Sequence, residues 1–280
     1  MCWRQLIDKA ERHIKTDLSK ENMKLEGKVS LITGASRGIG QSIAERFARE
    51  GSDLFLSATK VENLDDTKQL VSKYGRKTEV CGLDVSDRES TQAMVEEAIR
   101  VFGKIDVLVN NAGIYKVGPF NDIAYDDFDQ VMKVNVYGPF NIAQSVLKHM
   151  CSRKSGKVIN VSSVAGLWAR PKQSAYVISK HAMQGMTKSL GQEMAEFNIA
   201  VNAICPGMTQ TDLLTSSLEE FGKVHGVTPE QAEIMILNQI PMKRWVKPEE
   251  IANTALFLAS DESGGITGKS LVVDCGMLPF

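Results

Sequence analysis

The chain has 280 residues, of which 43% are hydrophobic, and its formal net charge is −1. This length allows one large domain or two small ones with a sizeable core. Because the chain is nearly neutral and its basic residues are scattered, we expect no nucleic-acid partner. No apolar run is long enough to span a bilayer. Residues 1–28 also lack the apolar core of a signal peptide.

The five cysteines are widely spaced, and the four histidines never pair at the spacing of metal ligands. No CxxC pair or Cys/His cluster occurs, so the sequence predicts neither a metal site nor a disulfide framework. Free thiols are typical of a reducing compartment, which predicts a cytoplasmic protein.

Apolar residues recur at helical spacing near the start of the chain: Trp3, Leu6, Ile7, Ala10, Ile14 and Leu18. The pattern predicts an amphipathic helical extension over 1–24, ahead of a main domain over 25–280. Packing of this helix on its own subunit or on a neighbour is favoured over binding to a membrane surface.

Apolar strands alternate with amphipathic helices along the main domain. The predicted strands are 28–33, 53–58, 78–85, 105–113, 157–163, 199–207 and 269–275. The predicted helices after the third strand include 87–102, 128–150, 174–195 and 248–260. Ser86 is the expected N-cap of the first of these four, with Glu89 in the capping-box position. Residues 212–245 are less regular.

Several of these strands are apolar on both faces, as strands covered by helices on both sides should be. The alternation predicts an α/β fold. We expect one domain of Rossmann type, with a doubly wound, seven-stranded parallel sheet and helices on both faces.

A glycine-rich turn, "TGASRGIG", joins the first strand to the helix that follows it. Its glycines, Gly34, Gly38 and Gly40, permit a sharp turn and a close approach of backbone to a ligand. Strand, turn and helix in this order bring a pyrophosphate onto a helix N-terminus. A tight turn without a ligand is the alternative, but the context favours dinucleotide binding.

The end of the second strand, "LSATK", carries no carboxylate for the adenosine ribose. Thr59 can instead donate a hydrogen bond to a 2′-phosphate, and Arg37 or Lys60 can neutralise it. These residues favour NADP(H) over NAD(H), although Arg37 could also be a solvated surface charge.

Seven motifs follow one another at characteristic spacing. They are "TGASRGIG", "DV" at 84–85, "NNAG" at 110–113, Asn135 in "VMKVNV", "VSS" at 161–163, "YVISK" at 176–180 and "PG" at 206–207. From about residue 25 to the C-terminus the chain resembles the short-chain dehydrogenase/reductase family. The motifs look most like those of its NADPH-dependent 3-oxoacyl-[acyl-carrier-protein] reductases.

The resemblance implies a cofactor site. In it Asp84 and Val85 contact the adenine, Asn111 lies beside the adenosine ribose, and Thr209 and Thr211 hold the nicotinamide end. The full implied set is Gly34, Ser36, Arg37, Gly38, Ile39, Gly40, Thr59, Asp84, Val85, Asn111, Tyr176, Lys180, Pro206, Gly207, Thr209 and Thr211.

Tyr176 is the candidate proton donor, with Lys180 on the same helical face four residues later. A phenol has a pKa of about 10. A lysine ammonium at ~4 Å contributes about 4 kcal/mol at an effective dielectric constant near 20. That energy corresponds to a decrease of roughly three pKa units. The resemblance implies that Lys180 also binds the nicotinamide ribose. It further implies that Ser163 hydrogen-bonds the substrate oxygen and that Asn135 holds a water in a proton relay.

These residues predict hydride transfer between NADP(H) and a ketone or secondary alcohol, either a 3-oxoacyl or another small to medium carbonyl compound. Lys154 matches one basic position at which such reductases meet acyl carrier protein, but Phe197 stands at the other. Residues 212–245 form a long substrate lid. Trp168, Arg170 and Lys172 could hold an anionic substrate, or both cations could be solvated.

Two alternatives stay open. One is an NAD(H)-linked polyol or cyclic alcohol dehydrogenase. The other is an NADP-binding sensor or scaffold without turnover. For each of these functions we expect a homotetramer or homodimer. The helices over 126–150 and 174–197 are long and rich in apolar residues, and the resemblance implies that they pair between subunits.

Overall fold

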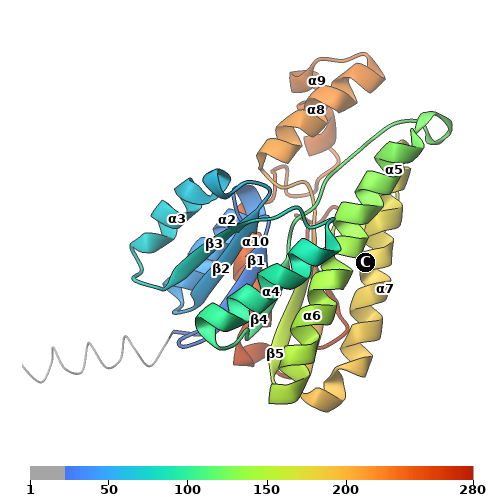
Figure 1. The fold of residues 1–280 in the computed structure, drawn as a ribbon. Coiled ribbons are helices and arrows are strands. Elements are labelled where there is room, and N and C mark those ends of the chain that lie inside the picture. Colours follow the sequence, from blue (N-terminus) through green and yellow to red (C-terminus); the bar gives the residue numbers. More distant parts are fainter. Residues whose placement is uncertain (1–22, 280) are drawn as a thin grey trace, which may run out of the picture.

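Seven parallel strands form one sheet in the order β3-β2-β1-β4-β5-β6-β7 (Figure 1). The computed structural model describes residues 23–279, so the predicted extension over 1–24 lies almost wholly outside the described residues. The strands are β1 (Val29–Thr33), β2 (Asp53–Ala58), β3 (Thr78–Gly82), β4 (Val107–Asn110), β5 (Gly156–Val161), β6 (Ile199–Pro206) and β7 (Ser270–Val273). The predicted seven-stranded parallel sheet of a single domain is confirmed.

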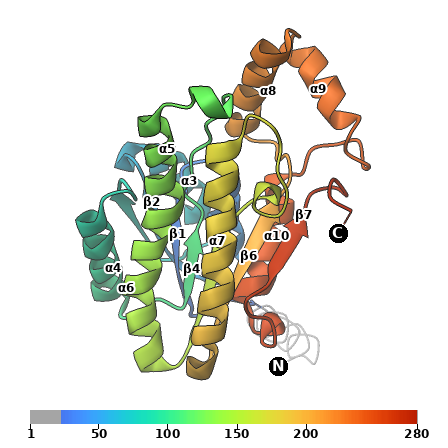
Figure 2. The ribbon, with the colours of Figure 1, turned by 90° about the vertical axis from the view of Figure 1, so that its right-hand side faces the viewer.

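Helices cover both faces of the sheet (Figures 1 and 2). One layer contains α2 (Gly38–Arg49), α3 (Asp65–Ser72) and α10 (Pro248–Ala259), and the other contains α4 (Arg88–Phe102), α5 (Tyr125–Met132), α6 (Gly138–Arg153) and α7 (Ser174–Glu193). Two apolar cores result, one on each face. Every residue of β1, β4 and β6 is buried, as expected for strands covered on both sides. No helix among residues 23–279 is long and apolar enough to cross a membrane.

The N-cap of α4 is Asp87, so the prediction of Ser86 was wrong. The Asp87 carboxylate accepts hydrogen bonds from the backbone N–H groups of Glu89, at 3.0 Å, and Ser90, at 3.4 Å. The Ser86 hydroxyl is directed to the Asp84 carboxylate instead, to which it donates a hydrogen bond at 2.7 Å. Because Asp87 caps these N–H groups, α4 begins at Arg88, one residue later than the sequence pattern predicted.

Two regions are more regular than predicted. The helix expected over 128–150 is part of a longer helical run, in which a π-helical turn over Lys133–Tyr137 joins α5 to α6. The segment 212–245 contains α8 (Asp212–His225) and α9 (Pro229–Leu237). Both stand above the carboxyl ends of the strands (Figures 1 and 2). A capping box between Thr228 and Gln231 begins α9.

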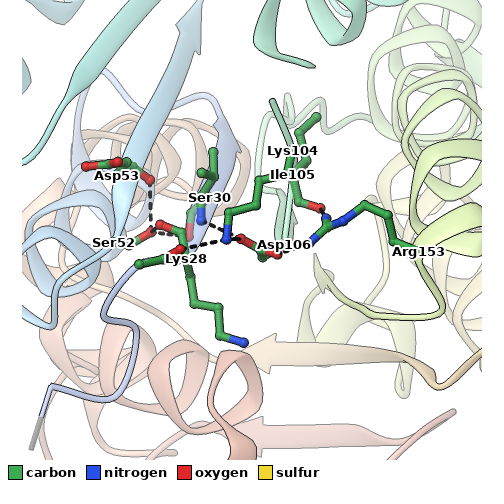
Figure 3. Close-up of polar contacts among 10 residues, drawn as sticks. Lys28, Ser30, Ser52, Asp53, Lys104, Ile105, Asp106 and Arg153 are labelled. Carbon is green, nitrogen blue, oxygen red and sulfur yellow. Dashed lines mark hydrogen bonds and ion pairs between the residues drawn. The ribbon is translucent and has the colours of Figure 1, made fainter. Parts of the chain in front are cut away.

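A buried carboxylate ties the amino ends of β1 and β4 to α6. Asp106 accepts hydrogen bonds from the Val29 N–H at 2.9 Å and from Arg153 at 2.7 Å, and it pairs with Lys104 at 2.9 Å (Figure 3). Burial pulls the pKa of Asp106 upward, but the hydrogen bonds from Arg153, Lys104 and the Val29 N–H together hold it below its usual value. The ionised form therefore stabilises the fold.

We predict that Asp106→Asn lowers the free energy of unfolding by about 1–3 kcal/mol at pH 7, because charged hydrogen bonds are lost. The folded-state pKa is lowered, so the contribution of Asp106 is present above the unfolded pKa of about 3.9 and disappears as the pH falls below it. Chemical unfolding at several pH values measures this. Asp122→Asn, at an exposed carboxylate, is the control. Equal stability of Asp106→Asn and the parent protein at pH 7 would contradict the prediction.

Candidate active site

A cleft of about 730 Å³ lies at the carboxyl ends of the strands, and loops after β1, β2, β4, β5 and β6 line it. β1 and β4 are neighbours in the middle of the sheet, where the strand order reverses direction. Ligands of open α/β sheets bind at such a switch point. All sixteen predicted cofactor residues except Gly40 line this cleft.

The glycine turn forms a close cradle at the floor of the cleft. Gly34 and Gly38 have φ values of +63° and +57°, a backbone region that favours glycine. A Cβ added at Gly34 would lie 2.9 Å from the Ala112 Cα, and one added at Gly40 would overlap the Gly34 carbonyl oxygen. Gly40 therefore acts from beneath the cleft, by letting α2 approach the turn. The first N–H groups of α2 have no acceptor within the helix, and they suit a pyrophosphate.

Arg37 lies at the edge of the cleft with Ala58 and Thr59, at the end predicted for the adenosine. Its guanidinium pairs with Asp212, the first residue of α8, at 3.4 Å. Both side chains are more than 70% exposed, so this ion pair contributes little free energy. Arg37 therefore keeps its capacity to bind an anion.

Asn111 and Thr211 line the cleft, and both also contact the glycine turn. The side-chain amide of Asn111 donates both its hydrogens to the turn, to the carbonyl oxygens of Thr33 at 3.0 Å and Gly34 at 2.9 Å. It therefore positions the glycine turn. The methyl group of Thr211 lies over Gly38, where an added Cβ would be 3.0 Å from it. Thr211 thus borders both the glycine turn and the cleft.

Ser163, Tyr176 and Lys180 meet at the opposite end of the cleft. Ser163 follows β5, whereas Tyr176 and Lys180 lie in the first two turns of α7. The Tyr176 hydroxyl is hydrogen-bonded to Ser163, and its ring packs edge-on against Tyr115 with centroids 5.0 Å apart. Burial raises the pKa of Tyr176 to about 12, although the hydrogen bond with Ser163 opposes this increase.

Lys180 is buried, and its ammonium donates a hydrogen bond to the Val161 carbonyl oxygen at 3.0 Å. It lies 5.5 Å from the centre of the Tyr176 ring. Burial lowers the pKa of Lys180 to about 8, so the group is mostly charged at neutral pH. The sequence argument expected this charge to lower the pKa of Tyr176. In this structure desolvation of the phenol dominates, and the pKa of Tyr176 is raised instead.

Asn135 lies in the π-helical turn and is fully buried, so it does not line the cleft. Its amide exchanges two hydrogen bonds with the backbone of Ile114, at 2.8 and 2.9 Å, and donates a third to Ser179 at 3.0 Å. A Cβ added at Gly113 would lie 3.3 Å from the Asn135 oxygen and 3.6 Å from the Lys180 nitrogen. Asn135 and Lys180 are therefore neighbours across Gly113, behind Tyr176.

The geometry can now be compared with known proteins. A family model described as enoyl-(acyl carrier protein) reductase matches residues 34–278. The 3-oxoacyl-[acyl-carrier-protein] reductase FabG of Thermotoga maritima is 40% identical over 256 residues, which cover 91% of this chain and all of the relative. The chain belongs to the short-chain dehydrogenase/reductase family. It is therefore an oxidoreductase, and its family uses a nicotinamide cofactor.

Solved structures of two other short-chain dehydrogenases/reductases are also similar. A single-residue variant of actinorhodin polyketide ketoreductase with NADPH has a TM-score of 0.87 and 33% identity, and the match covers 89% of this chain and 97% of that one. Xylitol dehydrogenase with NAD⁺ has the same TM-score and identity, and the match covers 89% and 98%. These two neighbours use different cofactors, so the fold alone does not choose between them.

Sequence reasoning missed three features of this short-chain dehydrogenase/reductase. Tyr115 packs on Tyr176, Gly113 separates Asn135 from Lys180, and Asp212 pairs with Arg37. Gly113 and Tyr115 stand in and just after the "NNAG" motif, which was the one available signal. No pattern in the sequence brings residue 212 to residue 37.

We predict that Lys180→Met stabilises the protein without cofactor by about 1–2 kcal/mol at pH 7. A decrease of the pKa from 10.5 to about 8 corresponds to a burial cost of about 3 kcal/mol. The lost hydrogen bond to Val161 removes about 1 kcal/mol of that gain. The burial cost is complete below pH 8 and is relieved as the pH rises from 8 towards 10.5, because the folded protein then releases the proton first.

Chemical unfolding at pH 7 and pH 9.5 measures the difference from the parent protein, which should shrink at the higher pH. Lys188→Met is the matched control, because Lys188 is an exposed lysine of the same helix. A Lys180→Met variant less stable than the parent at both pH values would disprove the burial argument.

Proposed function

We propose that this protein transfers a hydride between NADP(H) and a ketone or secondary alcohol. The observation that carries the proposal is the meeting of Ser163, Tyr176 and Lys180 in one cleft with the glycine cradle. The bound nicotinamide would supply or accept the hydride at the substrate carbon. The 40% identity to a 3-oxoacyl-[acyl-carrier-protein] reductase supports a carbonyl substrate.

The three side chains have distinct proposed roles in reduction. Tyr176 donates a proton to the carbonyl oxygen, since its high pKa keeps the phenol protonated at neutral pH. Ser163, hydrogen-bonded to Tyr176, donates a hydrogen bond to the same oxygen as negative charge develops there. Lys180 stabilises the phenolate that the proton transfer leaves, and Asn135 positions Lys180 from behind Gly113.

The cofactor site we propose extends from the glycine turn to the loop after β6. Its pyrophosphate end consists of Gly34, Ser36, Gly38 and Ile39, with Gly40 beneath them. The adenosine end is formed by Arg37, Thr59, Asp84, Val85 and Asn111, and the nicotinamide end by Tyr176, Lys180, Pro206, Gly207, Thr209 and Thr211. Residues 212–245 form the lid, from which Leu214 and Ser217 reach the cleft. No carboxylate stands at 57–60, where an NAD-selecting acid would lie, so we propose NADP(H).

We predict that Tyr176→Phe abolishes turnover and leaves the affinity for NADPH nearly unchanged, because only the proton donor is removed. Turnover is measured by loss of NADPH absorbance with a panel of ketones, and affinity by fluorescence titration. Tyr125→Phe, at an exposed tyrosine of α5, is the control. More than a few per cent of residual activity in Tyr176→Phe would refute its role.

We predict that Arg37→Ala raises the KM for NADPH by about ten- to a hundredfold. A charge-assisted hydrogen bond to the 2′-phosphate contributes roughly 1.5–3 kcal/mol. About 1.4 kcal/mol corresponds to each tenfold change in affinity. The KM for NADH should barely change, since NADH lacks this phosphate. Arg49→Ala, at the far end of α2, is the matched control. If the parent enzyme prefers NADH, or if both cofactors weaken equally, Arg37 is only a surface charge.

A second candidate function is NAD(H)-linked oxidation of a polyol or cyclic alcohol. Its support is the 33% identity to xylitol dehydrogenase, whose structure contains NAD⁺. The cofactor preference of the parent enzyme separates the two candidates. A sensor or scaffold without turnover would bind NADP but would reduce no ketone of the panel. The cytoplasmic location stays a prediction.

We also propose a homotetramer or homodimer formed through the helical layer of α5, α6 and α7. Three large apolar side chains of that layer are 41–52% exposed: Tyr137, Phe140 and Ile178. Pairing these helices between subunits would remove them from water. We predict a tetrameric or dimeric mass by light scattering at micromolar concentration, and Phe140→Glu should shift it towards the monomer. A monomeric parent protein would disprove the proposal.

A further inference from the structure

Arg170 lies in the part of the cleft where the substrate carbonyl would react. It comes from the loop between β5 and α7, and it lines the cleft together with Ser163, Tyr176 and Trp168. Its guanidinium stacks over the Trp168 ring at 5.0 Å from the centroid. Electrostatically it is also coupled to Tyr115, whose ring packs against Tyr176. Arg170 and the proposed proton donor therefore line one cleft, with Tyr115 as a common neighbour.

The same guanidinium is partly buried and stands apart from carboxylates. Among the residues that the structure describes, Arg170 forms no ion pair with an Asp or Glu within 4.0 Å. Burial lowers the pKa of Arg170, which shows that the charge is held at a cost to its hydration. Buried or half-buried arginines usually have an anionic partner. The cation–π contact with Trp168 holds the guanidinium in place without using its N–H groups, which can then bind a bidentate partner.

The two ends of the cleft differ in charge. Asp84 and Asp212 are the carboxylates that line it, and both stand at the adenosine end. At the end where Tyr176 lies, the charged lining residues are Arg170 and Lys180. A cation pair with no carboxylate attracts an anion, and Lys180 is already committed to Tyr176 and the Val161 carbonyl.

We propose that Arg170 binds a carboxylate of the substrate, and that the enzyme acts on an oxo acid or the matching hydroxy acid. The inference rests on the proposed function and names its substrate class. The carboxylate takes no part in the redox step: the ketone carbon gains the hydride, its oxygen gains the proton, and the carboxylate only orients the molecule. A neutral ketone, or a 3-oxoacyl thioester whose acid is already esterified, would leave Arg170 without this partner.

The test compares free oxo acids of increasing chain length with their own methyl esters, which lack the negative charge and carry one additional methyl group. With NADPH, at least one acid should have a kcat/KM about ten- to a hundredfold above that of its ester, as one charge-assisted contact implies. Arg170→Gln should abolish this ratio by raising the KM for the acid while leaving the ester within about twofold. Arg170→Lys, which keeps the charge, should restore part of the preference.

Lys172→Gln is the matched control, because it removes an exposed cation two residues further along the same loop. It should leave the ratio of acid to ester unchanged. The inference is overturned if the parent enzyme reduces every ester as well as its acid. It is also overturned if Arg170→Gln lowers acid and ester equally, because that result marks a purely structural role.

Calorimetric titration of the same acids and esters into the protein with NADP⁺ measures their binding separately from turnover. Binding of an acid that Arg170→Gln removes, without turnover of any compound, would refute the proposed function and support the carboxylate site. Turnover of neutral ketones without preferential binding of an acid would support the proposed function and refute the carboxylate site.

Discussion

The close approach of α2 to the turn after β1 is the constraint on which the rest of this site depends. Gly40 lies so near the Gly34 carbonyl oxygen that no side chain fits between them. Asn111 then bonds the same turn from the end of β4, which fixes the switch point of the sheet as one rigid corner. The first N–H groups of α2 lie at this corner, and the dinucleotide of the proposed function would extend from them towards β5 and α7.

Most of the framework could be predicted, because burial on both faces leaves its trace in strand composition. The runs "VLVN" in β4 and "KVINV" in β5 indicated their position inside a covered sheet. The segment 212–245 was harder to predict, since α8 and α9 stand off the sheet and their pattern is not set by packing against a central core. The cap of α4 depended on which of two adjacent polar side chains turns towards the helix. The bonds that decide it are local, because Ser86 bonds Asp84 whereas Asp87 bonds the first N–H groups of α4.

For the site, motif spacing indicated which residues meet but not how they affect one another. Tyr176 and Lys180 share a helical face, and the sequence suggested that the lysine would lower the pKa of the phenol. The structure adds what spacing cannot supply, namely the burial of both groups, which raises one pKa and lowers the other. The contact of Tyr115 with Tyr176 joins segments far apart in the sequence, and that of Arg170 with Trp168 depends on the path of a single loop. Neither contact leaves a periodic pattern in the sequence.

Two cations of the cleft are held despite the free-energy cost of removing them from water. Lys180 and Arg170 are both partly or wholly removed from water, and burial works against the charged form of each. A fold selected for stability alone would replace such cations by apolar side chains of similar size. Their retention at the end of the cleft that holds Tyr176 is understandable if negative charge arrives there. The proton donor would leave one such charge on the phenolate beside Lys180, and a carboxylate of the substrate would bring the other to Arg170.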